Sequence, residues 1–148
     1  MKIIVDSREQ APLPFEVGGV ITEVIVEGLP VGDYWMRFED GREAEIVFER
    51  KSISDLWGTL TNKMNHARFR REIARARENG LALVLIIEGT LSDVYAGNPR
   101  SRFKGLSMVR LLFTMWVRYN LCPVFCKDRA EMVRFITETF EAYGRENK

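Results

Sequence analysis

Residues 45–55 have the sequence Glu-Ile-Val-Phe-Glu-Arg-Lys-Ser-Ile-Ser-Asp, which is the most informative segment of the chain. Its apolar run at 46–48 predicts a strand that continues through the charged residues after it. Side chains of a strand alternate between the two faces of a sheet. Glu49 and Lys51 therefore share one face, and Arg50 points to the other.

A second strand is predicted upstream, where Asp33 precedes the apolar run 34–38. Asp40-Gly41 follows and is a strong signal for a hairpin turn. Antiparallel pairing about this turn brings Asp33 and Glu49 to neighbouring positions. Two carboxylates beside a lysine suit Mg²⁺, which prefers oxygen ligands and leaves positions to water and phosphate. Lys51 would then help to deprotonate the attacking water or stabilise the charge that develops on phosphorus.

Three motifs in order carry a resemblance to a known family. Asp33 followed by Glu49-x-Lys51 resembles the PD-(D/E)XK nuclease signature. With Gly32 before it and Asp55 three residues after Ser52, the pattern resembles the XPF-type structure-specific endonucleases. The opening Val5-Asp6-Ser7-Arg8-Glu9 is similar to the first motif of that family, and the resemblance extends to about residue 126.

The resemblance implies a role for each matching residue. Asp33 and Glu49 would be the principal ligands of Mg²⁺, for which Mn²⁺ would substitute. The backbone carbonyl of Arg50 would be a third ligand, and Lys51 would be the catalytic lysine.

The remaining motif residues would support this centre. Asp6 and Glu9 would lie beside the metal as further ligands, through water or a second ion. Arg8 would brace them or touch the substrate phosphate. Asp55 would anchor the following helix or the residues behind the ligands.

Each motif alone has an ordinary structural explanation. A Gly-Asp pair is a common turn, and a Glu-x-Lys sequence can be a solvated strand face. Ser52 or Ser54 together with Asp55 can cap a helix. The catalytic interpretation is favoured because the motifs occur together and in the family's order.

Length and composition predict a single nuclease domain spanning residues 1–148. The chain has only five prolines and offers no linker. The family's paired helix-hairpin-helix domains are not expected here, which suggests a stand-alone enzyme of viral or mobile-element type with a targeting partner. An intracellular protein is expected, because no segment resembles a signal peptide or a membrane span. Cys122 and Cys126, with His66 as the one histidine, predict reduced thiols and no zinc site.

Charge is unevenly distributed along the chain. Residues 1–60 hold six Lys and Arg against twelve Asp and Glu, whereas residues 61–148 hold sixteen against nine. An acidic segment that gathers cations beside a basic one that binds phosphates is what metal-assisted DNA cleavage requires. The predicted DNA contacts lie on a basic helix and in a later loop: Arg68, Arg71, Arg75, Arg100, Arg102 and Lys104.

The coarse organisation predicts a mixed central β-sheet flanked by helices, an α/β fold of the restriction-endonuclease-like kind. Strands are expected at 2–6, 20–26, 34–38, 45–51, 82–88 and 121–126. Helices are expected at 53–60, 63–79, 104–120 and 129–143.

The helix expected at 104–120 carries apolar residues around most of its circumference, more than the core of one small domain requires. Complete burial within the monomer is one explanation. The resemblance favours the other, a homodimer through residues 104–143, because XPF-type proteins dimerise through this region. Met115 is expected on the exposed face of this helix.

Two classes of function remain open at this point. The first is a Mg²⁺-dependent endonuclease that hydrolyses phosphodiester bonds in branched, flap or fork DNA, or a resolvase or restriction-type enzyme on the same core. The second is a non-catalytic DNA-binding or scaffold subunit of a nuclease complex. The presence of Asp33, Glu49 and Lys51 favours the enzyme, because degenerate subunits typically lose these residues.

Overall fold

The computed structural model describes residues 1–148, which form one six-stranded sheet in the order β2-β1-β3-β4-β5-β6. The strands are β1 (Lys2–Asp6), β2 (Glu23–Glu27), β3 (Tyr34–Arg37), β4 (Ile46–Ser52), β5 (Ala82–Glu88) and β6 (Cys122–Cys126). The helices are α1 (Ile53–Thr61), α2 (Lys63–Glu78), α3 (Leu91–Ala96), α4 (Gly105–Tyr119) and α5 (Arg129–Glu146). The predicted class, a mixed sheet flanked by helices, is confirmed.

The sheet combines parallel and antiparallel pairs. Strand β3 pairs antiparallel with both β1 and β4, while the pairs β1–β2, β4–β5 and β5–β6 are parallel. The predicted hairpin is present. In its turn the Phe38 amide donates to the Arg42 carbonyl, the Gly41 amide donates to the Phe38 carbonyl, and Gly41 has φ +91°. Tyr34 pairs with Phe48, so Asp33 and Glu49 do occupy neighbouring positions.

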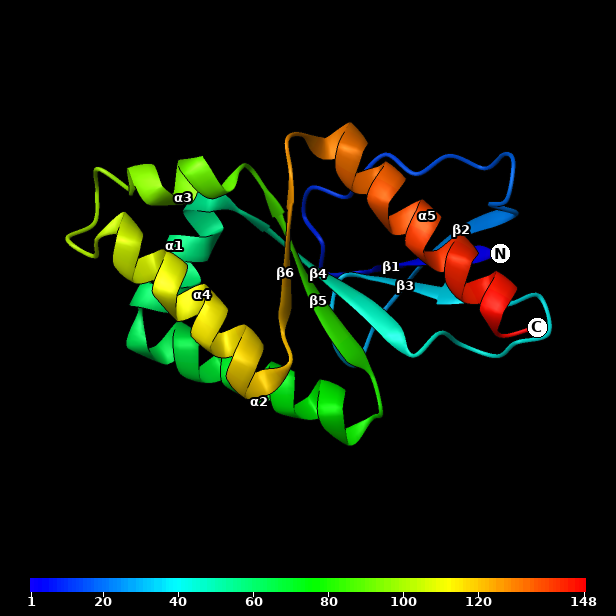
Figure 1. Ribbon diagram of the computed structural model, residues 1–148. Coiled ribbons are helices and arrows are strands. Elements are labelled where there is room, and N and C mark those ends of the chain that lie inside the picture. Colours follow the sequence, from blue (N-terminus) through cyan, green and yellow to red (C-terminus); the bar gives the residue numbers. More distant parts are fainter.

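Helices cover both faces of the sheet (Figure 1). Helices α1, α2, α3 and α4 pack on one face, where the odd-numbered residues of β4 and β5 contribute to a core centred on Trp57 and Leu85. The other face is covered by α5 and the segment that follows β1, with Phe48 packed edge-on against Phe140 at a centroid distance of 5.3 Å. The alternation along β4 thus gives Glu49 and Lys51 the face that α1 and α2 cover.

Most predicted boundaries agree with the structure to within one to three residues, and two features differ. Strand β2 begins at Glu23 rather than at residue 20, because Gly18 and Ile21 form an isolated bridge before it. Helix α3 was not predicted, although Thr90 and Asp93 form a capping box at its start.

The prediction that Met115 lies on an exposed face is wrong. Its side chain is only 2% exposed and belongs to the core beneath α4. The surplus apolar surface of that helix is formed instead by Leu106, Trp116 and Val117, and Val117 is 88% exposed.

None of the helices combines the length and apolar composition needed to cross a bilayer.

Candidate active site

The backbone around Gly32 fixes the position of Asp33. Gly32 has φ +76°, and a Cβ at this position would lie 2.5 Å from Val47, so only glycine fits against β4. The Asp33 amide donates to the Phe48 carbonyl at 2.7 Å, and the Arg50 amide donates to Asp33 Oδ2 at 2.8 Å. The carboxylate of Asp33 is therefore held directly against the Glu49–Lys51 segment of β4.

Asp33 and Glu49 form a pair of carboxylates, of which Glu49 is buried and Asp33 is partly buried. Glu49 is only 7% exposed. Burial is the main reason that the pKa of Asp33 is raised to about 7, and nearby Glu9 and Glu72 add to it. The pKa of Glu49 is also raised well above its ordinary value. Burial is the largest cause, and the neighbouring carboxylates of Asp33 and Glu72 raise it further. Without a bound cation, negative charge at this position is thus unfavourable.

Lys51 supplies a positive charge on the same face. Its Nζ lies 3.5 Å from Glu49 Oε1 and 5.6 Å from the centre of the Phe69 ring, which belongs to α2. The Lys51 side chain is 18% exposed. The ammonium group is therefore positioned beside the carboxylates and remains accessible to substrate.

Glu9 is bound on the other face of the sheet. Arg50 donates to it from Nε at 3.0 Å and from a terminal nitrogen at 2.9 Å, and the buried Tyr34 hydroxyl donates at 3.1 Å. This ion pair is largely buried and raises the pKa of Arg50. Glu9 therefore does not contact Glu49; its carboxylate holds the side chains of Arg50 and Tyr34. The metal-ligand role expected for Glu9 stays a prediction.

Asp6 orients Arg8 at the edge of the site. Both Asp6 oxygens accept hydrogen bonds from Arg8, at 3.0 and 3.2 Å, and Oδ1 also accepts from the Leu29 amide at 2.9 Å. Arg8 donates further to the Leu29 carbonyl, and its side chain is 71% exposed. Arg8 thus contacts Asp6 but not Glu9, and the second terminal nitrogen of its guanidinium donates to no partner within the protein. Its expected role at the metal centre stays a prediction.

Asp55 stabilises the start of α1. Its amide donates to the Ser52 hydroxyl at 3.0 Å, and its carboxylate accepts from the Ser52 amide at 3.4 Å. This is a capping box, which satisfies two backbone donors at the helix N-terminus. Asp55 therefore anchors the start of α1 directly after β4, and a role in catalysis stays a prediction.

Glu72 is a third acidic residue of the site that the sequence did not reveal. It lies on α2, and its Oε1 accepts a hydrogen bond from the Gly32 amide at 3.0 Å. The Glu72 carboxylate is close enough to affect the pKa of both Asp33 and Glu49. The packing of α2 against the segment before β3 places Glu72 beside Gly32. No sequence motif indicates this contact.

The predicted DNA-binding residues all lie on the surface and form no ion pair with an acidic residue. Arg68, Arg71 and Arg75 belong to α2, which also contributes Phe69 and Glu72 to the site. The loop between α3 and α4 carries the other three, and the Trp57 indole donates to the carbonyl of Phe103 in this loop at 3.4 Å. Both groups are therefore connected to elements that adjoin the carboxylates.

The chemistry of the donors fits a divalent cation. Asp33 Oδ1 and the Glu49 carboxylate accept no hydrogen bond from a backbone amide, and oxygen atoms of this kind are the ligands that Mg²⁺ and Mn²⁺ prefer. The side chains do not form a ready group of three or more ligands. A cation held by Asp33 and Glu49 would take its other ligands from water, backbone and substrate, as Mg²⁺ commonly does.

The architecture defines a class of α/β domain in which carboxylates at adjoining strand ends meet a lysine on one sheet face. The ERCC4 domain family model matches residues 5–139, so the chain belongs to the ERCC4 domain family. This match confirms the family that the three sequence motifs indicated.

Solved structures agree with this assignment. The chain is similar to XPF from Aeropyrum pernix, with a TM-score of 0.66 and 22% identity over 92% of this chain and 61% of that one. A second structure, XPF from Aeropyrum pernix in complex with DNA, gives a TM-score of 0.66 and 22% identity over 93% and 62%. This level of identity shows a shared fold. A comparison with curated protein sequences found no match.

Proposed function

We propose that the protein is a divalent-cation-dependent endonuclease that hydrolyses phosphodiester bonds in branched, flap or fork DNA. The observation that carries the proposal is the pairing of the partly buried Asp33 with the buried Glu49 on the adjacent strand, with Lys51 on the same face. Buried carboxylates with raised pKa values are unfavourable in the apo protein and favourable once a cation binds. Membership of the ERCC4 domain family supports the same activity.

Each side chain has a task that its position supports. Asp33 and Glu49 would hold Mg²⁺ or Mn²⁺, which supplies charge neutralisation at the phosphate and lowers the pKa of water. Lys51 orients the attacking water and stabilises negative charge on the phosphate in the transition state. Arg8, held by Asp6, donates to a phosphate oxygen from its free terminal nitrogen.

The DNA backbone would follow the exposed basic residues. The solvent-facing arginines of α2 and the loop residues Arg100, Arg102 and Lys104 supply the phosphate contacts. Helix α2 also adjoins Lys51 through Phe69, which connects the proposed DNA-binding helix to the carboxylates.

A non-catalytic scaffold subunit is the competing function. It would bind DNA through the same basic residues but would not need a buried, desolvated pair of carboxylates beside a lysine. The burial of Glu49 at 7% exposure carries a cost to folding that a scaffold has no reason to retain. The enzyme is therefore the better supported of the two.

A cleavage assay separates them. Labelled flap, fork, four-way junction, duplex and single-stranded DNAs are incubated with Mg²⁺, and again with EDTA. We expect cleavage of branched DNA only with Mg²⁺ and a loss of about a thousandfold in Glu49→Gln, roughly 4 kcal/mol at the transition state, with DNA affinity retained. Glu45→Gln, at an exposed position just before β4, is the matched control. Cleavage by Glu49→Gln within a few-fold of wild type would refute the assignment.

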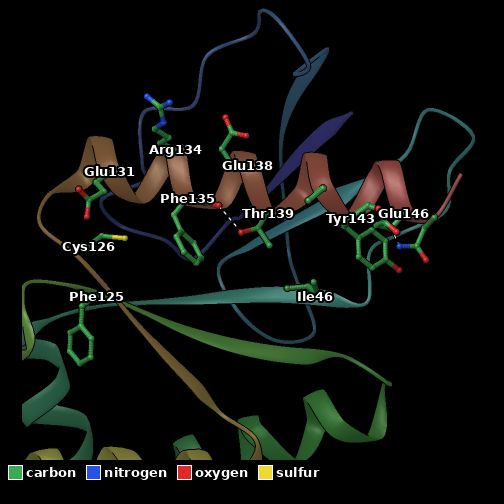
Figure 2. Close-up of a pocket in the computed structure, with 12 residues that line it drawn as sticks. Ile46, Phe125, Cys126, Glu131, Arg134, Phe135, Glu138, Thr139, Tyr143 and Glu146 are labelled. Atoms are coloured by element: carbon green, nitrogen blue, oxygen red, sulfur yellow. Dashed lines mark hydrogen bonds between the residues drawn. The ribbon is translucent and has the colours of Figure 1, made fainter.

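We also propose a homodimer through residues 104–143, as the sequence suggested. Helix α4 exposes Leu106, Trp116 and Val117, and Phe135 of α5 is 38% exposed. Figure 2 shows Phe135 directed from α5 toward the sheet. It lines a groove of about 790 Å³ to which Ile46 and Cys126 also contribute. Strand β6, the outer strand of the sheet, connects α4 and α5, so a second copy could cover these apolar surfaces together.

A further inference from the structure

We infer that Glu72 is a positioning residue of the cation site, whose carboxylate accepts hydrogen bonds from the hydration shell of the ion held by Asp33 and Glu49. Glu72 would thereby link this ion to the basic helix α2. The inference rests on the proposed nuclease function and adds a residue to it that none of the sequence motifs contains.

The first support is the place of Glu72 in the fold. Its Oε1 is fixed at 3.0 Å from the Gly32 amide, one residue before Asp33. Phe69, one helical turn earlier on α2, lies under Lys51. The two contacts orient α2 so that the Glu72 carboxylate faces the strand ends that carry Asp33 and Glu49.

The second support is what Glu72 does not bind. Helix α2 carries six Lys and Arg, yet Glu72 forms an ion pair with none of them. The half-buried carboxylate instead lies beside two other carboxylates, and its charge contributes to the raised pKa of each. Three neighbouring acidic groups are opposed by Lys51 and by the exposed guanidinium of Arg8, which interacts with Glu72 and Asp33. Such an arrangement is relieved by a divalent cation.

The side chains of Asp33, Glu49 and Glu72 are not arranged so that all three could coordinate one ion directly, which favours a contact between Glu72 and the ion through water. One oxygen of Glu72 is already engaged by Gly32, so direct coordination would cost that hydrogen bond. Mg²⁺ and Mn²⁺ in such sites retain several water molecules, and carboxylates that accept hydrogen bonds from these waters raise cation affinity. An indirect contact through water satisfies both observations.

A purely structural role for Glu72 is the competing explanation. In that case its only task is to accept the Gly32 hydrogen bond. Glu72→Gln distinguishes the two, because the amide oxygen still accepts from Gly32 but carries no charge. Glu72→Ala removes both the acceptor and the charge and serves as a second variant. Glu78→Gln, on an exposed position of the same helix, is the matched control.

The experiment measures Mn²⁺ binding to the full chain without DNA, by isothermal titration calorimetry at pH 7.5, together with the melting temperature in EDTA. We expect Glu72→Gln to bind Mn²⁺ about tenfold more weakly with a melting temperature at or above that of wild type. Glu78→Gln should match wild type, Asp33→Asn should lose binding, and Glu72→Ala should lose affinity as well as stability.

The outcomes separate this inference from the function on which it rests. If Asp33→Asn loses binding while Glu72→Gln binds Mn²⁺ as wild type does, the inference fails and the cation site stands. If Glu72→Gln lowers the melting temperature in EDTA as much as Glu72→Ala does, Glu72 is structural and the inference also fails. If wild type and Asp33→Asn bind Mn²⁺ equally or not at all, both the proposed site and the inference are refuted.

Discussion

Asp33→Asn should have opposite effects on stability and on activity, because the wild-type carboxylate is unfavourable in the apo protein. The folded state raises the pKa of Asp33 from 3.8 to about 7, chiefly through burial. One pH unit of difference corresponds to about 1.4 kcal/mol, so keeping this carboxylate ionised costs the folded state up to about 4 kcal/mol. The amide of asparagine is close in shape and can still accept the hydrogen bond from the Arg50 amide.

The pH dependence follows from the direction of this change in pKa. Between pH 4 and pH 7 the folded protein binds a proton at Asp33 that the unfolded chain has released, so wild-type stability decreases as pH rises through this range. At pH 4 the folded state is protonated at Asp33 and the unfolded chain is only about half ionised, so Asp33→Asn should differ from wild type by less than about 1 kcal/mol. Above pH 7 the full difference should appear, with the variant up to about 4 kcal/mol more stable.

Urea unfolding in EDTA at pH 4, 6 and 8 measures this difference. Asp40→Asn is the control, because Asp40 is an exposed turn residue whose pKa is lowered by hydrogen bonds from Arg42. Added Mn²⁺ should stabilise wild type by about 1.4 kcal/mol at ten times its dissociation constant, and Asp33→Asn much less. If Asp33→Asn is less stable than wild type at pH 8 in EDTA, the carboxylate is not strained and the argument from burial is wrong.

Three further substitutions test separate parts of the structure. Lys51→Ala should lower the single-turnover cleavage rate far more than Mn²⁺ or DNA affinity, because its contact strengthens in the transition state; a loss of DNA affinity with the rate preserved would make Lys51 a phosphate clamp. Arg50→Met should lower the free energy of unfolding in urea by about 3 kcal/mol, because it leaves the carboxylate of Glu9 without its ion-pair partner. Adding Glu9→Gln should restore part of this loss, whereas additive effects of the two substitutions would contradict a contribution from the ion pair. Val117→Glu should convert the proposed homodimer to a monomer, as measured by light scattering at micromolar concentration. Val26→Glu, at an exposed valine on the opposite edge of the sheet, is the control and should leave the dimer intact, and a wild-type protein that is monomeric with and without DNA would refute the dimer.

The sequence predicted the centre of the fold because the decisive signals there are local. Alternation along 46–51 assigns the faces of Glu49 and Lys51, and the Asp40-Gly41 turn sets the neighbouring strand. These signals depend only on residues close in sequence, and the structure confirms the resulting position of Asp33. The helix missed at Leu91–Ala96 also carried a local signal, the capping box of Thr90 and Asp93, but its six residues are too few for a periodic pattern.

Features that depend on packing between elements could not be predicted in this way. Glu72 is one of two glutamates on a basic helix, and the sequence does not distinguish it from the exposed Glu78. The apolar surplus of α4 was recognised, but the helix has apolar residues on nearly every side. The pattern therefore could not show that Met115 faces the core while Val117 faces solvent. Both depend on the rotation of a helix about its axis, which is fixed by tertiary contacts.

Arg50 shows how one residue of the motif serves both faces of the sheet. Its amide donates to Asp33 Oδ2 on the face that carries Glu49, while its guanidinium binds Glu9 on the other. The position of the Asp33 carboxylate therefore depends on the backbone of Arg50, and the anchoring of the segment after β1 depends on its side chain. A substitution here should leave the Asp33 hydrogen bond in place while releasing Glu9. The effect of Arg50→Met on cleavage would then follow the loss of order around Glu9 and Arg8, and a normal affinity for Mn²⁺ in this variant is the corresponding expectation.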